Sequence, residues 1–133
     1  MDEKRILIVE DEPRIALALC RALEFPPRGA NKVEISPVAE TALAKLKSEP
    51  FDLVITDLRM PGMGGVELLR QVRGISPNTR LMLITAFGSP EIKDVTQRLG
   101  AVYLPKPFSL REFVAKVEDI LGIEGPAPDL EAH

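Results

Sequence analysis

Five short apolar runs alternate with longer amphipathic stretches, and this alternation limits the folds open to the chain more than any other feature. The runs are RILIV (5–9), KVEIS (32–36), DLVIT (52–56), RLMLI (80–84) and AVYL (101–104). Each has the length of a strand and is rich in branched residues. Strands that alternate with helices predict a parallel sheet with right-handed crossovers and helices on both faces. We therefore expect a three-layer α/β domain.

The amphipathic segments between the runs have the apolar spacing of helices that pack one face on a core. The last segment has the clearest signal, because Ser109 and Glu112 form a capping box and Gly122 marks the expected end. Its apolar stripe consists of Leu110, Phe113, Val114, Val117, Ile120 and Leu121. The segment that starts at Ser89 and Pro90 has a thinner stripe, made of Ile92, Val95 and Leu99. We expect that helix to be weakly anchored.

Length and composition favour one globular domain. The 133 residues suit a single domain of about 100–150 residues. We expect the domain to span residues 1–121, and the Gly/Pro-rich residues 122–133 to be a linker or a disordered tail. A second interruption, FPPRGAN (25–31), predicts a long loop broken by prolines.

Charge and targeting signals exclude several classes of protein. The net charge is −3 with no basic block, which argues against direct nucleic-acid binding. No apolar run approaches the ~20 residues that span a bilayer, and the charged start MDEKR is unlike a signal peptide. A single cysteine, Cys20, cannot form an internal disulfide. The only histidine is His133, which excludes histidine-based catalysis, and we expect a cytoplasmic protein.

Polar residues follow four of the apolar runs, at the ends where a parallel sheet of this kind places its functional crevice. Glu10 and Asp11 follow the first run, Asp57 the third, Thr85 the fourth and Lys106 the fifth. Each has a simpler explanation, such as a helix N-terminus for the acids, a turn for Asp57 or a solvated surface for Lys106. One shared site explains all five positions together, whereas the simpler explanations require five coincidences.

A carboxylate cluster of this kind requires a cation. Two like charges ~4 Å apart repel by about 4 kcal/mol at an effective dielectric of 20. A site made of oxygen ligands suits a hard ion, and an incomplete carboxylate set that leaves room for water and phosphate favours Mg²⁺ over a calcium cage. We therefore expect Mg²⁺ as the cofactor.

Four motifs together resemble the receiver domain of two-component response regulators. They are ILIVEDEP (6–13), DLVITDLRMPGMGG (52–65), LMLITAFG (81–88) and GAVYLPKPF (100–108), and the resemblance extends over residues 5–121. It implies a flavodoxin-like, doubly wound (βα)₅ fold with the strand order 2-1-3-4-5. Asp11 and Asp57 would then meet at the point where the strand order reverses.

The resemblance implies a metal and phosphoryl site. Asp57 corresponds to the phosphoacceptor, which attacks a phosphohistidine and forms an acyl phosphate. Glu10, Asp11, Asp57 and the backbone carbonyl of Arg59 would hold Mg²⁺, with Asp11 as a direct ligand. Glu10 is longer than the usual aspartate and would act through water or by holding Lys106. Glu12 is better explained by the first turn of the following helix.

The remaining matched residues would stabilise and report the phosphoryl group. Lys106 would neutralise phosphoryl oxygens and Thr85 would donate a hydrogen bond to them. A cis bond between Lys106 and Pro107 would aim the lysine inward. Tyr103 matches the switch aromatic that moves with Thr85, although an ordinary half-buried tyrosine explains its residue type equally well.

Two departures from the family pattern concern access to the phosphoryl group, since Arg59 and Phe87 each lie two residues beyond a functional residue. A bulky Phe87 would shield the group from water and prolong its lifetime.

The implied partners are a sensor histidine kinase or a phosphotransfer protein, a downstream output domain or protein, and a second copy in a phosphorylation-dependent homodimer. The output face would be the fourth helix, fifth strand and fifth helix. The chain would be a stand-alone receiver or part of a longer regulator, and not a turnover enzyme.

Three alternatives remain open. A Mg²⁺-dependent aspartyl-phosphate phosphohydrolase would need a second aspartate two residues after its nucleophile, where this chain has Arg59. A flavin-binding module would need a phosphate-cradling loop in place of EDEP. A degenerate receiver that serves only as an interaction module would not need the complete set of acids, Thr85 and Lys106.

Overall fold

The structure is a computed structural model that describes residues 3–24 and 31–122. Five strands and five helices alternate along these residues, and the strands form one parallel sheet in the order β2-β1-β3-β4-β5. The fold class and strand order expected from the sequence are confirmed. The elements are β1 Lys4–Val9, α1 Pro13–Glu24, β2 Asn31–Ser36, α2 Ala39–Ser48, β3 Leu53–Asp57, α3 Gly65–Ile75, β4 Arg80–Thr85, α4 Pro90–Arg98, β5 Ala101–Pro105 and α5 Leu110–Leu121.

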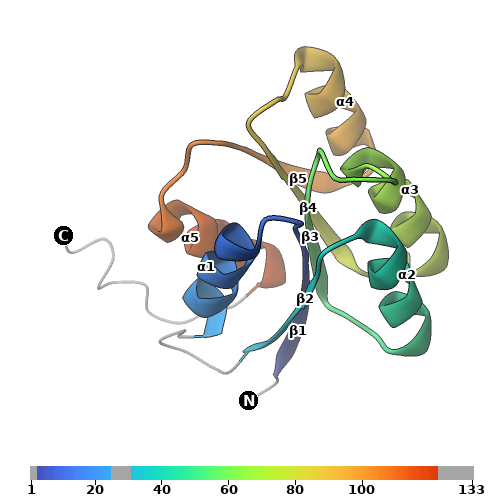
Figure 1. Cartoon of the computed structure of the whole chain (residues 1–133), viewed down its shortest axis with the longest axis vertical. Coiled ribbons are helices and arrows are strands. Elements are labelled where there is room, and N and C mark those ends of the chain that lie inside the picture. The colour runs from blue at the N-terminus through green and yellow to red at the C-terminus, as the bar shows by residue number, and fades with distance from the viewer. Residues whose placement is uncertain (1–2, 25–30, 123–133) are drawn as a thin grey trace.

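Helices cover both faces of the sheet, with α1 and α5 on one side and α2, α3 and α4 on the other (Figure 1). Alternate residues of the strands point to the two sides and form two separate cores. Leu7, Val54 and Leu83 pack with α2 and α3, whereas Ile8, Ile55 and Met82 pack with α1 and α5. Because the central strands are buried on both faces, their apolar runs are nearly continuous.

Helix α5 begins and ends where the sequence predicts. The Ser109 side chain and the Glu112 side chain form the capping box, and Gly122 ends the helix in the left-handed conformation with φ 67°. The expected apolar stripe is wrong at Leu110, whose surface is 49% exposed. Leu110 is the first residue of the helix, so it lies beyond the layer of contacts that buries Phe113 one turn later.

Helix α4 is held by few buried side chains, as its thin apolar stripe predicts. Ser89 caps the helix by accepting a hydrogen bond from the Ile92 backbone N–H, and Pro90 is its first residue. Thr96 is its only fully buried residue, and the Thr96 hydroxyl donates to the Ile92 carbonyl at 2.7 Å. The expected stripe residues Ile92, Val95 and Leu99 are only partly buried.

Strand boundaries differ from the expected ones by one residue at several ends. Asp57 and Thr85 are the last residues of β3 and β4, where the sequence patterns placed them just beyond the strands. Of the expected loop 25–31, only Asn31 is described, and it begins β2. The expected tail lies outside the described residues except for Gly122. Within the described part of the chain, no helix is long and apolar enough to cross a membrane.

The register of the strands brings their carboxyl ends to one edge of the sheet. Val9 is paired with Thr56, Asp57 with Ile84, and Thr85 with Pro105. The residues at or just after these ends therefore lie side by side, and we call this edge the acidic edge.

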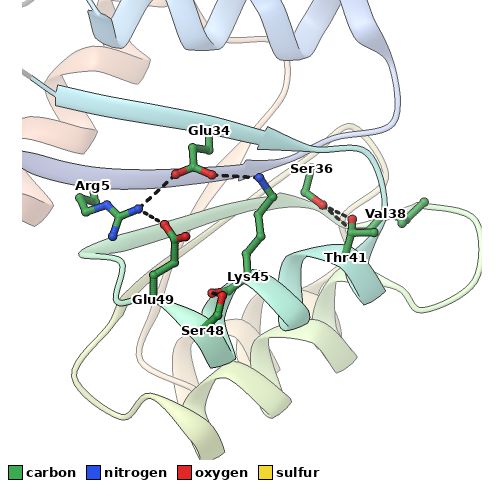
Figure 2. Close-up of polar contacts among 8 residues, drawn as sticks. All are labelled: Arg5, Glu34, Ser36, Val38, Thr41, Lys45, Ser48 and Glu49. Carbon is green, nitrogen blue, oxygen red and sulfur yellow. Dashed lines mark hydrogen bonds and ion pairs between the residues drawn. The ribbon is translucent and has the colours of Figure 1, made fainter.

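A second group of charged side chains lies against β1 and β2, beside the last turns of α2 (Figure 2). The Arg5 guanidinium forms ion pairs with Glu34, at 3.1 Å, and with Glu49. The Lys45 ammonium pairs with the other oxygen of Glu34 at 2.9 Å. These four residues form what we call the Arg5 network, which joins two strands to one helix.

Candidate functional site

Asp57 lies at the centre of the acidic edge. Its carboxylate is at the end of the most central strand, and the residue is 9% exposed. One oxygen, Oδ2, accepts a hydrogen bond from the Lys106 ammonium at 3.1 Å. The other, Oδ1, accepts from the Arg59 backbone N–H at 3.3 Å. The carboxylate is therefore fixed in direction and paired with one cation.

Gly65 allows the chain to turn tightly below this aspartate. Its backbone N–H donates to the Leu58 carbonyl at 2.9 Å, and α3 begins at once. A Cβ atom on Gly65 would overlap the Asp57 carbonyl oxygen and lie 3.0 Å from the Asp57 carbonyl carbon. Only glycine fits this close approach of helix to strand end. Gly65 was not among the residues expected at this site, although the glycine run MPGMGG contained the signal.

Glu10 has an incompletely paired carboxylate in a buried position. The residue is 3% exposed. Its Oε2 accepts from the Glu12 backbone N–H at 3.0 Å, while its Oε1 has no hydrogen-bond partner among the described residues. The pKa of Glu10 is raised to about 7, chiefly by burial and also by the nearby Asp57 carboxyl, against the opposing effects of the Glu12 backbone N–H and the Lys106 ammonium. A buried, unpaired carboxylate oxygen beside a second carboxylate favours the binding of a proton or a cation.

The two acids that follow Glu10 are exposed. Asp11 lies at the open side of the acidic edge. Glu12 precedes α1, which begins at Pro13, and its carboxylate accepts from the Arg14 backbone N–H at 3.2 Å. Glu12 therefore caps the helix from the position before its first residue, and the expectation that it lies within the first turn is wrong by one residue.

Thr85 and Lys106 complete the edge on the far side of Asp57. Thr85 is 1% exposed, and its hydroxyl oxygen accepts from the Phe87 backbone N–H at 2.9 Å. The Lys106 backbone N–H donates to the Thr85 carbonyl at 2.8 Å. The Lys106–Pro107 peptide bond is cis. The backbone hydrogen bond from Lys106 to Thr85 attaches the segment that contains Lys106 to the end of β4.

Arg59 and Phe87 contact one another across two loops. The Arg59 guanidinium carbon lies 4.1 Å from the centre of the Phe87 ring, a cation–π arrangement. Phe87 is 58% exposed, so the stack lies at the surface of the acidic edge. Both residues were expected near the site but their contact was not, because spacing along the chain does not show which side chains of two different loops meet.

The residues of the acidic edge fit a magnesium ion that keeps part of its water shell. Among the described residues, no group of three or more His, Cys, Asp or Glu side chains is arranged to hold a metal alone. Mg²⁺ usually binds one or two carboxylates and completes its shell with water and substrate phosphate. The unpaired Glu10 oxygen and the buried Asp57 carboxylate supply such a partial set.

The sheet order defines a flavodoxin-like α/β protein, and the acidic edge lies at the topological switch point between β1 and β3. The family model of the response regulator receiver domain matches residues 6–118. The chain therefore belongs to this family of two-component signalling domains.

Comparisons with individual proteins agree with this assignment. The response regulator receiver protein CpdR of Brucella abortus is 36% identical over 119 residues, which cover 89% of this chain and 97% of CpdR. The response regulator MprA of Mycobacterium avium is 32% identical over 129 residues, which cover 96% of this chain and 55% of MprA. A crystal structure of a CheY-like receiver domain protein from Methanospirillum hungatei superimposes with a TM-score of 0.84 at 33% identity, and covers 91% of this chain and 95% of that one.

Proposed function

We propose that the chain accepts a phosphoryl group on Asp57 in a Mg²⁺-dependent reaction. The observation that carries this proposal is the buried Asp57 carboxylate, paired with Lys106 at 3.1 Å and placed beside an unpaired Glu10 oxygen. The donor would be a phosphohistidine of a sensor histidine kinase or a phosphotransfer protein. An Asp57 oxygen attacks the phosphorus, the P–N bond breaks with its electron pair going to the ring nitrogen, and the imidazole leaves as a neutral ring that takes its proton from solvent.

The residues of the acidic edge have distinct roles in this reaction. Phosphoryl transfer depends on position and charge neutralisation more than on covalent chemistry by the protein. The Lys106 ammonium holds Asp57 in direction and would neutralise one phosphoryl oxygen. Thr85 would donate its hydroxyl proton to another. Glu10, Asp11, Asp57 and the Arg59 carbonyl would hold Mg²⁺, which supplies charge neutralisation between the carboxylates and the incoming phosphoryl group.

The test is phosphorylation by a small phosphodonor such as acetyl phosphate, followed by intact mass. Wild type should gain one phosphoryl group with Mg²⁺ present and lose it in hydroxylamine, which cleaves acyl phosphates. Asp57→Asn should gain none. The matched control is Asp94→Asn, since Asp94 is an exposed aspartate of α4, and it should behave as wild type.

The same experiment separates the alternatives. A wild type that never gains mass would favour a degenerate receiver that acts only as an interaction module. Continuous release of phosphate with rapid turnover would favour a phosphohydrolase.

We also infer that Arg59 and Phe87 slow the loss of the phosphoryl group. Their stack joins the loops after β3 and β4, each two residues from a site residue, and so limits the approach of water. Phe87→Ala should shorten the lifetime of the phosphorylated protein, measured as loss of the added mass. An unchanged lifetime would contradict this role.

The output and context of the domain are part of the proposal. We infer that residues 1–121 form the receiver domain in the cytoplasm, and that the α4–β5–α5 face controls a downstream domain or protein or forms a phosphorylation-dependent dimer. The sparse buried contacts of α4 support this face as the element that shifts. Gel filtration with and without a phosphoryl mimic tests the dimer.

A further inference from the structure

Thr56 lies in β3 directly before Asp57 and is 0% exposed. Its partners in the sheet are the apolar, buried residues Val9 and Leu83. A hydroxyl in such a position must form a hydrogen bond, because burial without a partner is costly. The Thr56 hydroxyl donates to the Asp57 backbone carbonyl at 2.9 Å, and the Met60 sulfur lies 3.9 Å away. A hydroxyl has one proton, and the carbonyl oxygen is the nearer and stronger acceptor.

The hydrogen bond from Thr56 fixes the first peptide group after the Asp57 side chain. The carbonyl of this group, on Asp57, accepts from the Thr56 hydroxyl. Its N–H, on Leu58, donates to the Ile84 carbonyl at 3.3 Å. Because a peptide group is planar, holding both of its polar ends fixes its orientation.

The next peptide group, between Leu58 and Arg59, is held in the same way. Its carbonyl accepts from the Gly65 backbone N–H at 2.9 Å, and its N–H donates to the Asp57 Oδ1 atom at 3.3 Å. The Arg59 carbonyl, which follows, accepts no backbone hydrogen bond among the described residues. The two fixed peptide groups therefore determine the direction of a carbonyl that is free to bind a ligand.

We propose that Thr56 is a positioning residue for the magnesium and phosphoryl site. Its hydroxyl fixes the Asp57 carbonyl, and through the two peptide groups it fixes the Arg59 carbonyl relative to the Asp57 carboxylate. Valine has nearly the shape of threonine but no hydroxyl, so Thr56→Val would remove this hold on the loop. The role in metal binding rests on the proposed function, whereas the hold on the loop does not.

The hold on the loop is tested by amide hydrogen exchange, measured by NMR in metal-free buffer. In Thr56→Val, the Leu58 and Arg59 amides should exchange about 3- to 10-fold faster than in wild type, as expected for the loss of one hydrogen bond. Unchanged exchange would overturn the proposal.

The matched control is Thr79→Val. Thr79 is also buried, and its hydroxyl donates to the Phe51 carbonyl at 3.0 Å, at the edge of the sheet opposite the acidic edge. This variant removes the same group far from the loop and should leave the exchange of the Leu58 and Arg59 amides at the wild-type rate. Equal acceleration in both variants would indicate a general loss of stability and would also overturn the proposal.

The role in metal binding is tested by isothermal titration with Mg²⁺. Thr56→Val should bind about 3- to 10-fold more weakly than wild type. Thr79→Val should bind as wild type does, and so should Thr56→Ser, which keeps the hydroxyl. Equal affinity in Thr56→Val and wild type would refute the role in metal binding, and so would an equal weakening in Thr79→Val.

A second pair of variants decides the proposal if Thr56→Val does not fold. Thr56→Ser and Thr56→Ala differ only in the hydroxyl, and Thr56→Ala should show the faster amide exchange and the weaker Mg²⁺ binding. Equal values in the two variants would overturn the proposal. A failure of either variant to fold would overturn it as well, because Thr56 would then serve the fold as a whole.

Intact mass after treatment with acetyl phosphate is measured on the same samples. The Mg²⁺ concentration that gives half the maximal rate should rise in Thr56→Val, while the rate at saturating Mg²⁺ should approach that of wild type. A rate that stays low at saturating Mg²⁺ would overturn the role in metal binding. A wild type that takes up no phosphoryl group refutes the proposed function, and the amide exchange in metal-free buffer still decides whether Thr56 holds the loop.

Discussion

The acidic edge and the Arg5 network differ in whether their acidic side chains are matched by basic ones. At the acidic edge, the Glu10 and Asp57 carboxyls both lie near the Lys106 ammonium, and one Glu10 oxygen has no partner among the described residues. In the Arg5 network, two acids alternate with two bases along an open chain of ion pairs that runs from Glu49 through Arg5 and Glu34 to Lys45 (Figure 2). The Arg5 network, in which each acid has a basic partner, contributes to folding. The acidic edge has more negative than positive charge, and a cationic ligand can offset the difference.

Because of this difference in charge balance, we expect pH to affect the stability of the two regions in opposite directions. Burial raises the pKa of Glu10, so this carboxyl favours the protonated form. The pKa of Glu34 is lowered, chiefly by its hydrogen bond to Lys45 and also by Arg5, against the opposing effect of burial. Rising pH should therefore weaken the fold at the acidic edge and strengthen it at the Arg5 network.

The largest effect is expected from Gly65→Ala, which tests whether the backbone fixes the acidic edge in place. The new Cβ would collide with the Asp57 carbonyl, and backbone atoms cannot rotate away. We expect a loss of about 3 kcal/mol or more in the free energy of unfolding. Denaturant titration measures it. Gly74→Ala is the control and should be neutral or stabilising by up to about 1 kcal/mol, since it removes a glycine from the last turn of α3 without a clash.

A loss below about 1 kcal/mol in Gly65→Ala would show that α3 can move away from β3 at little cost. The acidic edge would then owe its geometry to side chains, as the Arg5 network does, and the contrast between the two regions would weaken.

Glu10→Gln should produce the next largest effect, and only above acidic pH. Below its usual pKa of 4.5, Glu10 is protonated in both the folded and the unfolded protein. As pH rises toward about 7, the unfolded chain releases the proton first, so the folded wild type loses stability. Glutamine does not titrate, and the variant should gain up to about 3 kcal/mol over wild type above this range in metal-free buffer.

Unfolding measured from pH 4 to 8, with and without Mg²⁺, checks this expectation. The advantage of the variant should shrink when Mg²⁺ is added, because the ion offsets the charge of Glu10 in wild type. An advantage that is constant with pH would contradict the raised pKa and the charge deficit at this edge.

Arg5→Met removes the base that two acids share and tests the other side of the comparison. Glu34 and Glu49 would lose a common partner, and Phe51 would lose the guanidinium 4.8 Å from its ring centre. We expect a lower thermal midpoint at neutral pH. Arg70→Met is the control, because Arg70 forms only an exposed pair with Glu67 at 3.7 Å, and it should shift the midpoint less. Equal shifts would mean that the Arg5 network is no stronger than a surface pair.

The two regions also differ in how far the sequence predicted them. The acidic edge was predictable, because parallel strands end at one edge of a sheet and Glu10, Asp57 and Lys106 stand at such ends. The Arg5 network was not, since Glu34 and Glu49 lie far from Arg5 along the chain and no motif marks their pairing. The contact between the Arg59 and Phe87 side chains of two different loops was not predictable for the same reason.

The smallest effect is expected from Lys45→Met, which separates the outer ion pair of the Arg5 network from the inner one. The pKa of Glu34 is lowered in the folded protein, so its contribution is present above its unfolded pKa and is lost as pH falls through the folded value. Lys45 is the largest cause of this lowering, but its pair with Glu34 is partly exposed. We expect a loss of about 0.5 kcal/mol at neutral pH that fades in acid. Lys47→Met, an exposed lysine of the same turn, is the control for removal of one positive charge. If the loss persisted at the acid end of the titration, packing of the lysine stem and not its charge would hold α2 to β2, and the pH contrast between the two regions would rest on Arg5 alone.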